Sequence, residues 1–152
     1  MKHNRKVYGP ALRLTVISLV MCGLLFPILV TGLAQVMLPY QANGEIVQSH
    51  GHDVGSILIA QNFTSPLFFQ PRNASDSASG VDPDITLQDA YSQIPRIHNA
   101  TGISVDELKQ IVDANVERTI WITGEPYVNV LRLNLILIDK YPSTFQSFSQ
   151  RA

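Results

Sequence analysis

The stretch that decides the fold is LTVISLVMCGLLFPILVTGLAQVML, residues 14–38, which contains no charged side chain. As an α-helix these residues would extend about 37 Å, enough to cross a hydrocarbon core of about 30 Å with some tilt. Pro27 is expected to bend such a helix, although proline is tolerated in membrane-spanning segments. The stretch therefore predicts a retained single-pass transmembrane helix.

Two other interpretations of this stretch are weaker. Gly32-Leu33-Ala34 offers a small-x-small cleavage site for a signal peptide. However, the apolar run is longer than the usual signal core of about 7–15 residues, and it continues beyond that site. A lipid-modified Cys22 is disfavoured because the preceding Met21 is large.

Charge on the two sides of the helix predicts its orientation. Four basic residues precede the helix, and none follows it until Arg72. Because basic flanks stay in the cytoplasm, residues 1–13 are expected there and the later residues outside. We expect three parts: a basic cytoplasmic N-terminus at 1–13, the transmembrane helix at 14–38, and an extracytoplasmic α+β domain at 39–152.

Composition excludes several classes of protein. The 152 residues carry a net charge of −1, which argues against a basic nucleic-acid-binding protein. The single cysteine excludes a disulfide framework and a cysteine-rich zinc site. No phosphate-binding loop, zinc-protease motif or nucleophile elbow is present. The absence of these motifs leaves no catalytic residue predicted. His50 and His52 lack a third nearby ligand, so no metal site is predicted either.

Turn and capping signals organise the outer part. Strands are expected at 46–47, 56–60, 67–69 and 127–130. Capping boxes at 86–89 and 104–107 predict two helices that form a hairpin around Gly102, and Pro95 should kink or interrupt the first. Residues 131–138 fit a strand or a helix, and the polar tail from Tyr141 is expected to fray.

Five blocks give the sequence a specific resemblance: YQANGEI (40–46), GSILIAQNFT (55–64), SASGVD (77–82), ITLQDAYSQIPR (85–96) and NVLRLNL (129–135). In this order, after one N-terminal helix, they resemble the C subunit of the Kdp-type potassium-transporting ATPase. Members of that family usually carry a longer segment before the SASG-like block, so the chain resembles a compact variant.

The resemblance implies a non-catalytic accessory subunit in the cell membrane. Its partners would be a channel-like potassium-binding subunit and a P-type ATPase subunit, together with membrane lipid. The complex imports potassium with high affinity using ATP, and this subunit would aid assembly and raise the ATP affinity of the pump subunit. Potassium and ATP would be handled by the complex, with no cofactor bound directly here.

Candidate site residues come from the helix and from the blocks. Small side chains for close helix packing are Gly23, Gly32 and Ala34. Candidates for interfaces or family motifs are Gln41, Asn43, Gly44, Gly55, Ser56, Gln61, Asn62, Ser79, Gly80, Asp82, Gln88, Gln93, Arg96, Asn129 and Asn134. The resemblance connects the block of Gln88 and Gln93 with ATP. The predicted orientation puts both outside, which favours a packing role and an indirect effect on ATP affinity.

Further hypotheses concern the outer surface. Carboxylates at 76, 82, 84 and 89 would form a negative patch that steers potassium, although a solvated acidic loop explains them as well. Three glycosylation sequons begin at Asn62, Asn73 and Asn99. The alternative function is a membrane-anchored extracytoplasmic sensor or binding domain that acts outside a transport complex.

Overall fold

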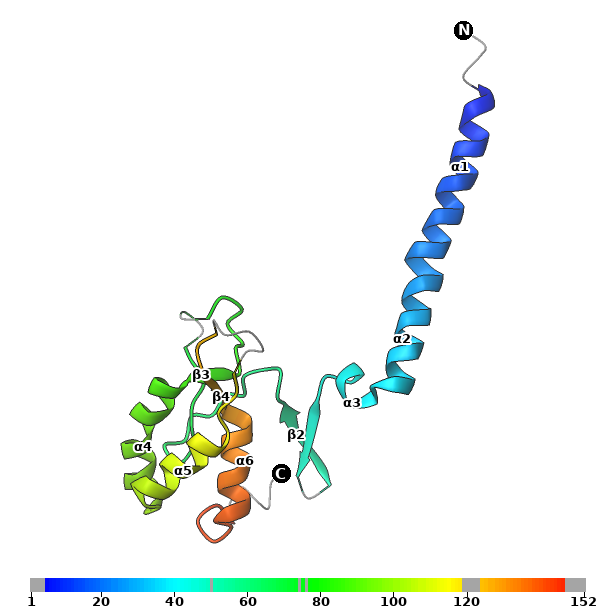
Figure 1. Ribbon diagram of the computed structural model, residues 1–152. Helices are drawn as coiled ribbons and strands as arrows, with labels where there is room; N and C mark the ends of the chain where they lie inside the picture. The colour runs from blue at the N-terminus through cyan, green and yellow to red at the C-terminus, as the bar shows by residue number, and fades with distance from the viewer. Residues whose placement is uncertain (1–4, 50, 74, 76, 119–123, 147–152) are drawn as a thin grey trace. The chain divides into compact units, whose positions relative to one another are not determined.

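The computed structural model describes residues 5–49, 51–73, 75, 77–118 and 124–146 of the chain. The chain forms two compact units, residues 1–43 and 44–152, and each is described by itself. The first unit is helical and the second combines helices with two small sheets (Figure 1).

The first unit is a long apolar helix with one irregular turn. It consists of α1 (Arg5–Val20), the π-helical turn η1 (Met21–Leu25) and α2 (Phe26–Met37), followed by the short α3 (Pro39–Ala42). The N–H of Phe26 donates to the carbonyl of Met21, five residues back. Because Pro27 has no N–H to donate, the π turn carries the helix past the proline without ending it.

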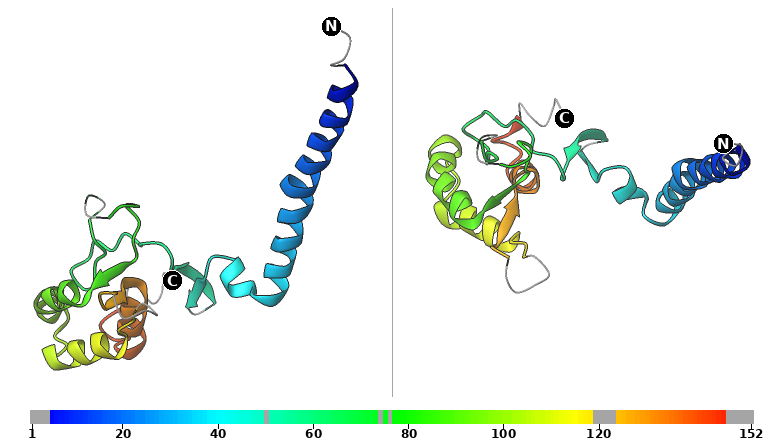
Figure 2. Two further views of the ribbon diagram at one scale, coloured as in Figure 1. Left: turned by 45° about the horizontal axis from the view of Figure 1, so that its top comes forward. Right: turned by 90° about the horizontal axis from the view of Figure 1, so that it is seen from above.

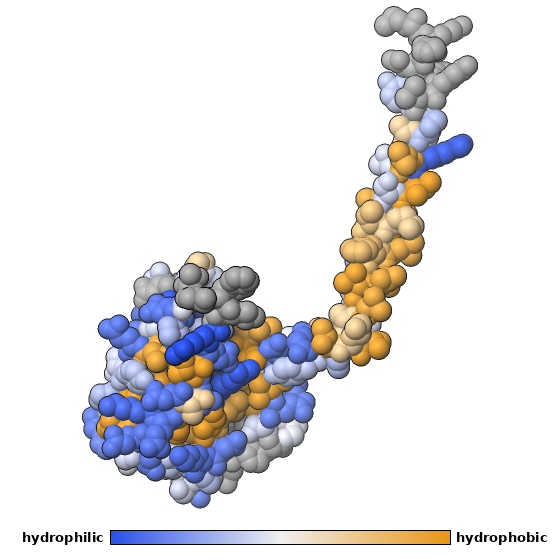
Figure 3. Space-filling model, in the orientation of Figure 1, coloured by the Kyte–Doolittle hydropathy of each residue, from blue (hydrophilic) through white to orange (hydrophobic). Residues whose placement is uncertain are grey.

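The length and composition of this helix suit a membrane span. The span Tyr8–Met37 has 30 residues and contains an 18-residue window with a mean hydropathy of 2.4, of which no residue is buried inside the protein. Apolar residues cover the visible face of the helix (Figure 3). The helix is a candidate by length and composition, as the sequence predicted.

The second unit begins with a β-hairpin. Strand β1 (Ile46–Ser49) pairs with β2 (His52–Ser56) in antiparallel register, with an irregularity between Val47 and Gln48. The predicted strand at 46–47 is confirmed. The prediction of a strand at 56–60 is wrong, because the chain turns after Ser56, where the Ser56 carbonyl accepts from the N–H of Ile59 at 3.3 Å.

A second sheet and three helices enclose the core. Strand β3 (Asp84–Thr86) pairs antiparallel with β4 (Tyr127–Asn129), and Ile85 lies opposite Val128. Helices α4 (Leu87–Thr101) and α5 (Val105–Ala114) pack side by side, as the views in Figures 1 and 2 agree. The helix α6 (Val130–Lys140) follows β4 directly, which decides the ambiguous stretch 131–138 in favour of a helix.

The predicted caps of α4 and α5 are confirmed. Thr86 accepts a hydrogen bond from the N–H of Asp89, and Ser104 forms a complete capping box with Glu107. Gly102 ends α4 in the left-handed conformation, with φ of 76°. The expected interruption at Pro95 does not occur: α4 runs through it as one helix, whose inner face is fixed by buried Ile94 and Ile97.

Aromatic packing corrects two further expectations. Residues 67–69 form no strand; they turn, and Phe68 and Phe69 are buried in the core. The tail does not fray from Tyr141, because Phe145 is fully buried and stacks on Phe68 with ring centroids 5.1 Å apart. A polar tail can thus be anchored by one aromatic side chain.

Candidate functional site

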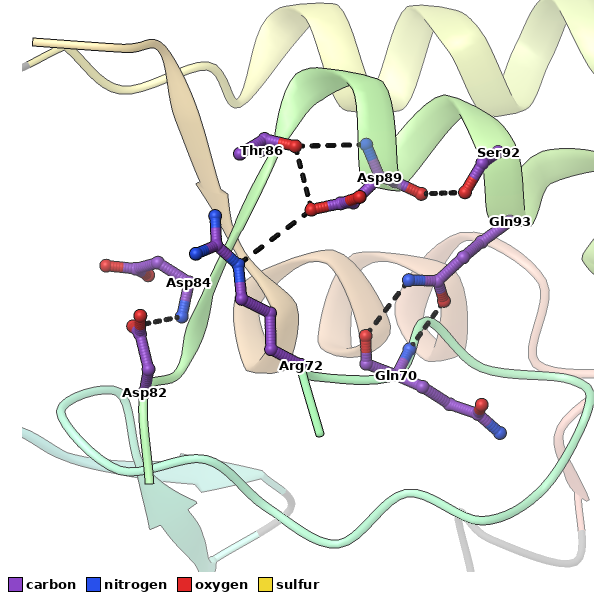
Figure 4. A network of polar contacts seen from close by, with 8 residues as sticks. All are labelled: Gln70, Arg72, Asp82, Asp84, Thr86, Asp89, Ser92 and Gln93. Carbon is purple, nitrogen blue, oxygen red and sulfur yellow. Dashed lines mark hydrogen bonds and ion pairs between the residues drawn. The ribbon is translucent and has the colours of Figure 1, made fainter. Parts of the chain in front are cut away.

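The segment 66–70 lies outside any strand, and its Phe68 and Phe69 are buried in the core. Side chains take the place of a neighbouring strand. Asn134 of α6 accepts from the N–H of Phe69 at 2.8 Å and donates to its carbonyl at 2.9 Å. Gln93 of α4 does the same for Gln70, at 2.8 and 3.0 Å (Figure 4). Each side-chain amide therefore satisfies both main-chain groups of one residue, as a neighbouring strand would.

Arg96 completes this arrangement. Its guanidinium donates to the carbonyls of Pro66 and Phe68, each at 3.0 Å, and to Oε1 of Gln93 at 2.8 Å. Partial burial lowers the pKa of Arg96. We call Gln93, Arg96 and Asn134 the amide clamp. Three predicted site residues from two helices thus converge on one irregular segment.

Four other candidates meet at the base of the β1–β2 hairpin. The hydroxyl of Ser56 donates to the carbonyl of Gly44 at 2.6 Å. At Gly55 a Cβ would lie 2.9 Å from Cδ of Gln61, so a larger residue there would displace the amide end of that side chain. Nε2 of Gln61 donates to the carbonyl of Ile59 at 3.1 Å. These contacts fix the start of the second unit.

Asn129 joins three parts of the second unit. Its Nδ2 donates to the carbonyl of Ile57 at 2.8 Å and to Oδ1 of Asp84 at 2.9 Å. Its Oδ1 accepts from the N–H of Arg132 at 3.2 Å and so caps α6. Burial raises the pKa of Asp84, and the hydrogen bond from Asn129 opposes that rise.

Those carboxylates of the proposed negative patch that the structure describes have partners within the chain. Oδ1 of Asp82 accepts from the N–H of Asp84 at 3.1 Å. Oδ2 of Asp89 accepts from the hydroxyl of Thr86 at 2.8 Å and lies 3.8 Å from Nε of Arg72 (Figure 4). The fourth carboxylate, at residue 76, is outside the described residues. These contacts give the acidic side chains local structural roles.

Two open cavities of about 480 and 420 Å³ lie beside the clamp. Both are lined by Gln70, Pro71, Arg72 and Asn73. The larger also includes the predicted candidates Gln61, Asn62 and Gly80 in its lining, and the smaller includes Gln93. Their amide, hydroxyl and guanidinium groups suit hydrogen bonding to a polar ligand. The described part of the chain holds no cluster of three or more metal-ligating side chains.

The remaining candidates lie apart from the clamp. In the first unit, Asn43 donates to Oε1 of Gln35 at 3.2 Å, and Gln41 is exposed on α3. The small residues of the long helix are exposed or partly exposed: Gly23, Gly32 and Ala34. In the second unit, Gln88 and Ser79 are both exposed. The site residues predicted from the sequence therefore do not form one site.

Sequence reasoning missed some contacts. Tyr91 donates to Asp113 across the α4–α5 pair, and Arg132 pairs with Glu117. Their spacings of 22 and 15 residues match no local motif. Of the other sequence hypotheses, His50 and the middle of the sequon at Asn73 fall outside the described residues, and the sequon residues Asn62 and Asn99 are exposed.

Comparison with known proteins identifies the family. The family described as "KdpC: K+-transporting ATPase, c chain" matches residues 8–76 and 73–139. A potassium-transporting ATPase KdpC subunit from Bacillus cytotoxicus is 31% identical over 185 positions, covering 89% of this chain and 96% of the relative. The Geobacter sulfurreducens KdpC subunit is also 31% identical, covering 90% and 100%. The chain belongs to the KdpC family, as the resemblance indicated.

The alignment with the Bacillus cytotoxicus protein runs over 185 positions, whereas this chain has 152 residues. The two stretches that match the family overlap at residues 73–76, directly after Arg72, which lines both cavities.

Proposed function

We propose that this protein is a non-catalytic accessory subunit of a high-affinity, ATP-driven potassium import complex. Membership of the KdpC family carries the proposal, since that family is named for a subunit of the potassium-transporting ATPase. The partners are a channel-like potassium-binding subunit and a P-type ATPase subunit. The subunit promotes their assembly and raises the ATP affinity of the pump subunit through a coupling free energy carried by the complex.

The proposed topology has one membrane crossing, in the cell membrane. The helix Tyr8–Met37 supports it by length and composition, and the basic residues before that helix favour a cytoplasmic N-terminus. Residues 1–13 are then cytoplasmic, 14–38 span the bilayer, and 39–152 lie outside. Gly23, Gly32 and Ala34 provide close approach for a partner helix.

The amide clamp supports a structural role for the block that contains Gln88 and Gln93. Gln93 uses both ends of its amide on Gln70, so it has little capacity left for a nucleotide. Gln88 is exposed on α4 and remains available to a partner. In the proposed topology an effect on ATP affinity is indirect, because ATP and these residues lie on opposite sides of the membrane.

Co-purification from native membranes tests the proposal. The tagged full chain is extracted in mild detergent from cells starved of potassium, and the captured proteins are identified by mass spectrometry. The channel-like and ATPase subunits should be recovered in near-stoichiometric amounts. The ATP concentration for half-maximal hydrolysis should rise when the complex is prepared without this subunit. Recovery of the chain alone would refute the proposal and favour a membrane-anchored sensor domain.

A further inference from the structure

The π-helical turn η1 leaves one main-chain carbonyl of the long helix without its usual donors. In an α-helix the carbonyl of Cys22 would accept a hydrogen bond from the N–H of residue 26. Here the N–H of Phe26 donates to the carbonyl of Met21 instead. The next residue, Pro27, has no N–H to donate. The carbonyl of Cys22 therefore receives a hydrogen bond from neither residue, and we call it the open carbonyl.

Side chains in the described part of this helix do not replace the missing donor. A serine or threonine hydroxyl can donate to a carbonyl three or four residues earlier in a helix. Thr15 does so, because its hydroxyl donates to the carbonyl of Ala11 at 2.9 Å. The corresponding positions after Cys22 hold Leu25 and Phe26, whose side chains have no hydrogen-bond donor. A donor for the open carbonyl therefore has to come from outside the helix.

In the proposed membrane crossing the open carbonyl lies deep in the bilayer. Cys22 is near the middle of the span Tyr8–Met37, and a hydrocarbon core takes up about 20 residues of such a helix. Lipid acyl chains have no donor, so an unsatisfied main-chain group there is strongly unfavourable. The helix surface beside the open carbonyl is clear, because a Cβ at Gly23 would meet nothing within 4 Å. A side chain from a neighbouring helix can approach there.

The chemistry of the open carbonyl and its depth define the donor. A carbonyl accepts from N–H or O–H groups, and charged donors are costly at the centre of a bilayer. Neutral hydroxyl and amide side chains are the groups that form hydrogen bonds between transmembrane helices. Neighbouring helices are also known to satisfy main-chain groups that a proline frees in such helices. The open carbonyl therefore suits a neutral polar side chain from a second helix.

We propose that the open carbonyl of Cys22 accepts a hydrogen bond from a hydroxyl or amide side chain of a neighbouring transmembrane helix of the same pump. This inference rests on the proposed function and adds to it one polar contact within the bilayer. A directional contact fixes the depth and rotation at which the helix packs, which apolar side chains alone specify weakly. Loss of one such hydrogen bond is expected to lower partner retention about fivefold.

The single cysteine makes the open carbonyl directly observable. Cysteine labelled with ¹³C at its carbonyl carbon marks residue 22 alone, because the chain has no other cysteine. The labelled full chain is studied in phospholipid vesicles and after assembly with unlabelled pump subunits, and the infrared absorption of the labelled carbonyl is recorded. We expect this absorption to move to lower frequency on assembly, because a hydrogen bond weakens the C=O bond.

A proline substitution gives a second readout. Pro27→Ala restores the missing N–H, so the helix can supply its own donors and no longer needs one from a partner. Pro10→Ala is the matched control, because Pro10 lies in α1 of the same helix, outside η1. Partner subunits are quantified after extraction in mild detergent and a dilute wash. We expect about fivefold less partner with Pro27→Ala and no change with Pro10→Ala.

Several results would overturn the contact while the proposed function stands. One is an equal carbonyl frequency in vesicles and in the complex, since water or no donor at all would then account for both. Another is a shift in vesicles that grows with chain concentration, which would identify a second copy as the partner. Equal partner retention by Pro27→Ala and wild type is a third. If the wild-type chain does not assemble with pump subunits, the proposed function itself has failed.

Discussion

Replacing Asn134 by alanine should destabilise the second unit more than any surface substitution. The side chain is 1% exposed and makes two hydrogen bonds to Phe69, whose own exposure is 0%. In the variant, both the N–H and the carbonyl of Phe69 lose their partner inside the core. Each buried main-chain group left unpaired costs about 1–3 kcal/mol, so the expected loss is about 2–6 kcal/mol.

This loss is large against the whole stability of such a unit. A domain of about 100 residues unfolds with about 5–15 kcal/mol. The full chain in mild detergent is titrated with urea, and unfolding is followed by circular dichroism. Ser92→Ala is the matched control, because Ser92 makes one exposed hydrogen bond to the carbonyl of Asp89 at 2.7 Å. The control should change stability by less than about 0.5 kcal/mol.

Hydrogen exchange gives a local readout of the same change. In Asn134→Ala the amide of Phe69 should lose protection, while that of Gln70, which is bound to Gln93, should lose less. A destabilisation below about 1 kcal/mol with an unchanged Phe69 amide would refute the view that the clamp replaces a strand.

Three further outcomes are expected from caps and charges. Gly102→Ala places a side chain at φ of 76° with no neighbour in its way, so it should cost about 1 kcal/mol in urea unfolding, and Gly102→Asn less. Burial raises the pKa of Asp84 above 3.8 in the folded protein. The contribution of Asp84 to stability should therefore fall as pH rises through its folded-state pKa. Asp84→Asn should abolish that fall in unfolding curves recorded at a series of pH values. Hydrogen bonds from the hydroxyl and the main-chain N–H of Ser104 lower the pKa of Glu107 below 4.5, so stability should fall as pH drops through the folded-state value. Ser104→Ala removes the hydroxyl bond and should reduce this acid dependence in the same assay.

Local signals predict much of the helical part of the fold. The caps at Thr86 and Ser104 and the stop at Gly102 can be predicted because each depends on residues within four positions. Residues 131–138 are ambiguous in sequence because their apolar side chains fit either period. The structure resolves this by the Asn129 cap, which starts α6 directly after β4.

Long-range contacts cannot be predicted from patterns. The run at 67–69 has the composition of a strand, but its partners are side chains 28 and 65 residues away rather than a neighbouring strand. Phe145 lies in a polar tail, and nothing nearby in the sequence indicates its contact with the distant Phe68. Several candidate residues are implied by the resemblance. Only the structure shows that Gln93, Arg96 and Asn134 form hydrogen bonds with the same segment, residues 66–70.

The amide clamp also has a practical consequence for engineering this protein. The clamp fixes the backbone up to Gln70. Its contacts come from side chains of α4 and α6 and from no other residue after Arg72. Additional chain inserted at 73–76 would leave those contacts in place, and the two stretches that match the KdpC family overlap at these residues. This position is therefore suited to a fluorescent label or an epitope tag, and so gives a site for following the assembled protein in living cells without touching its core.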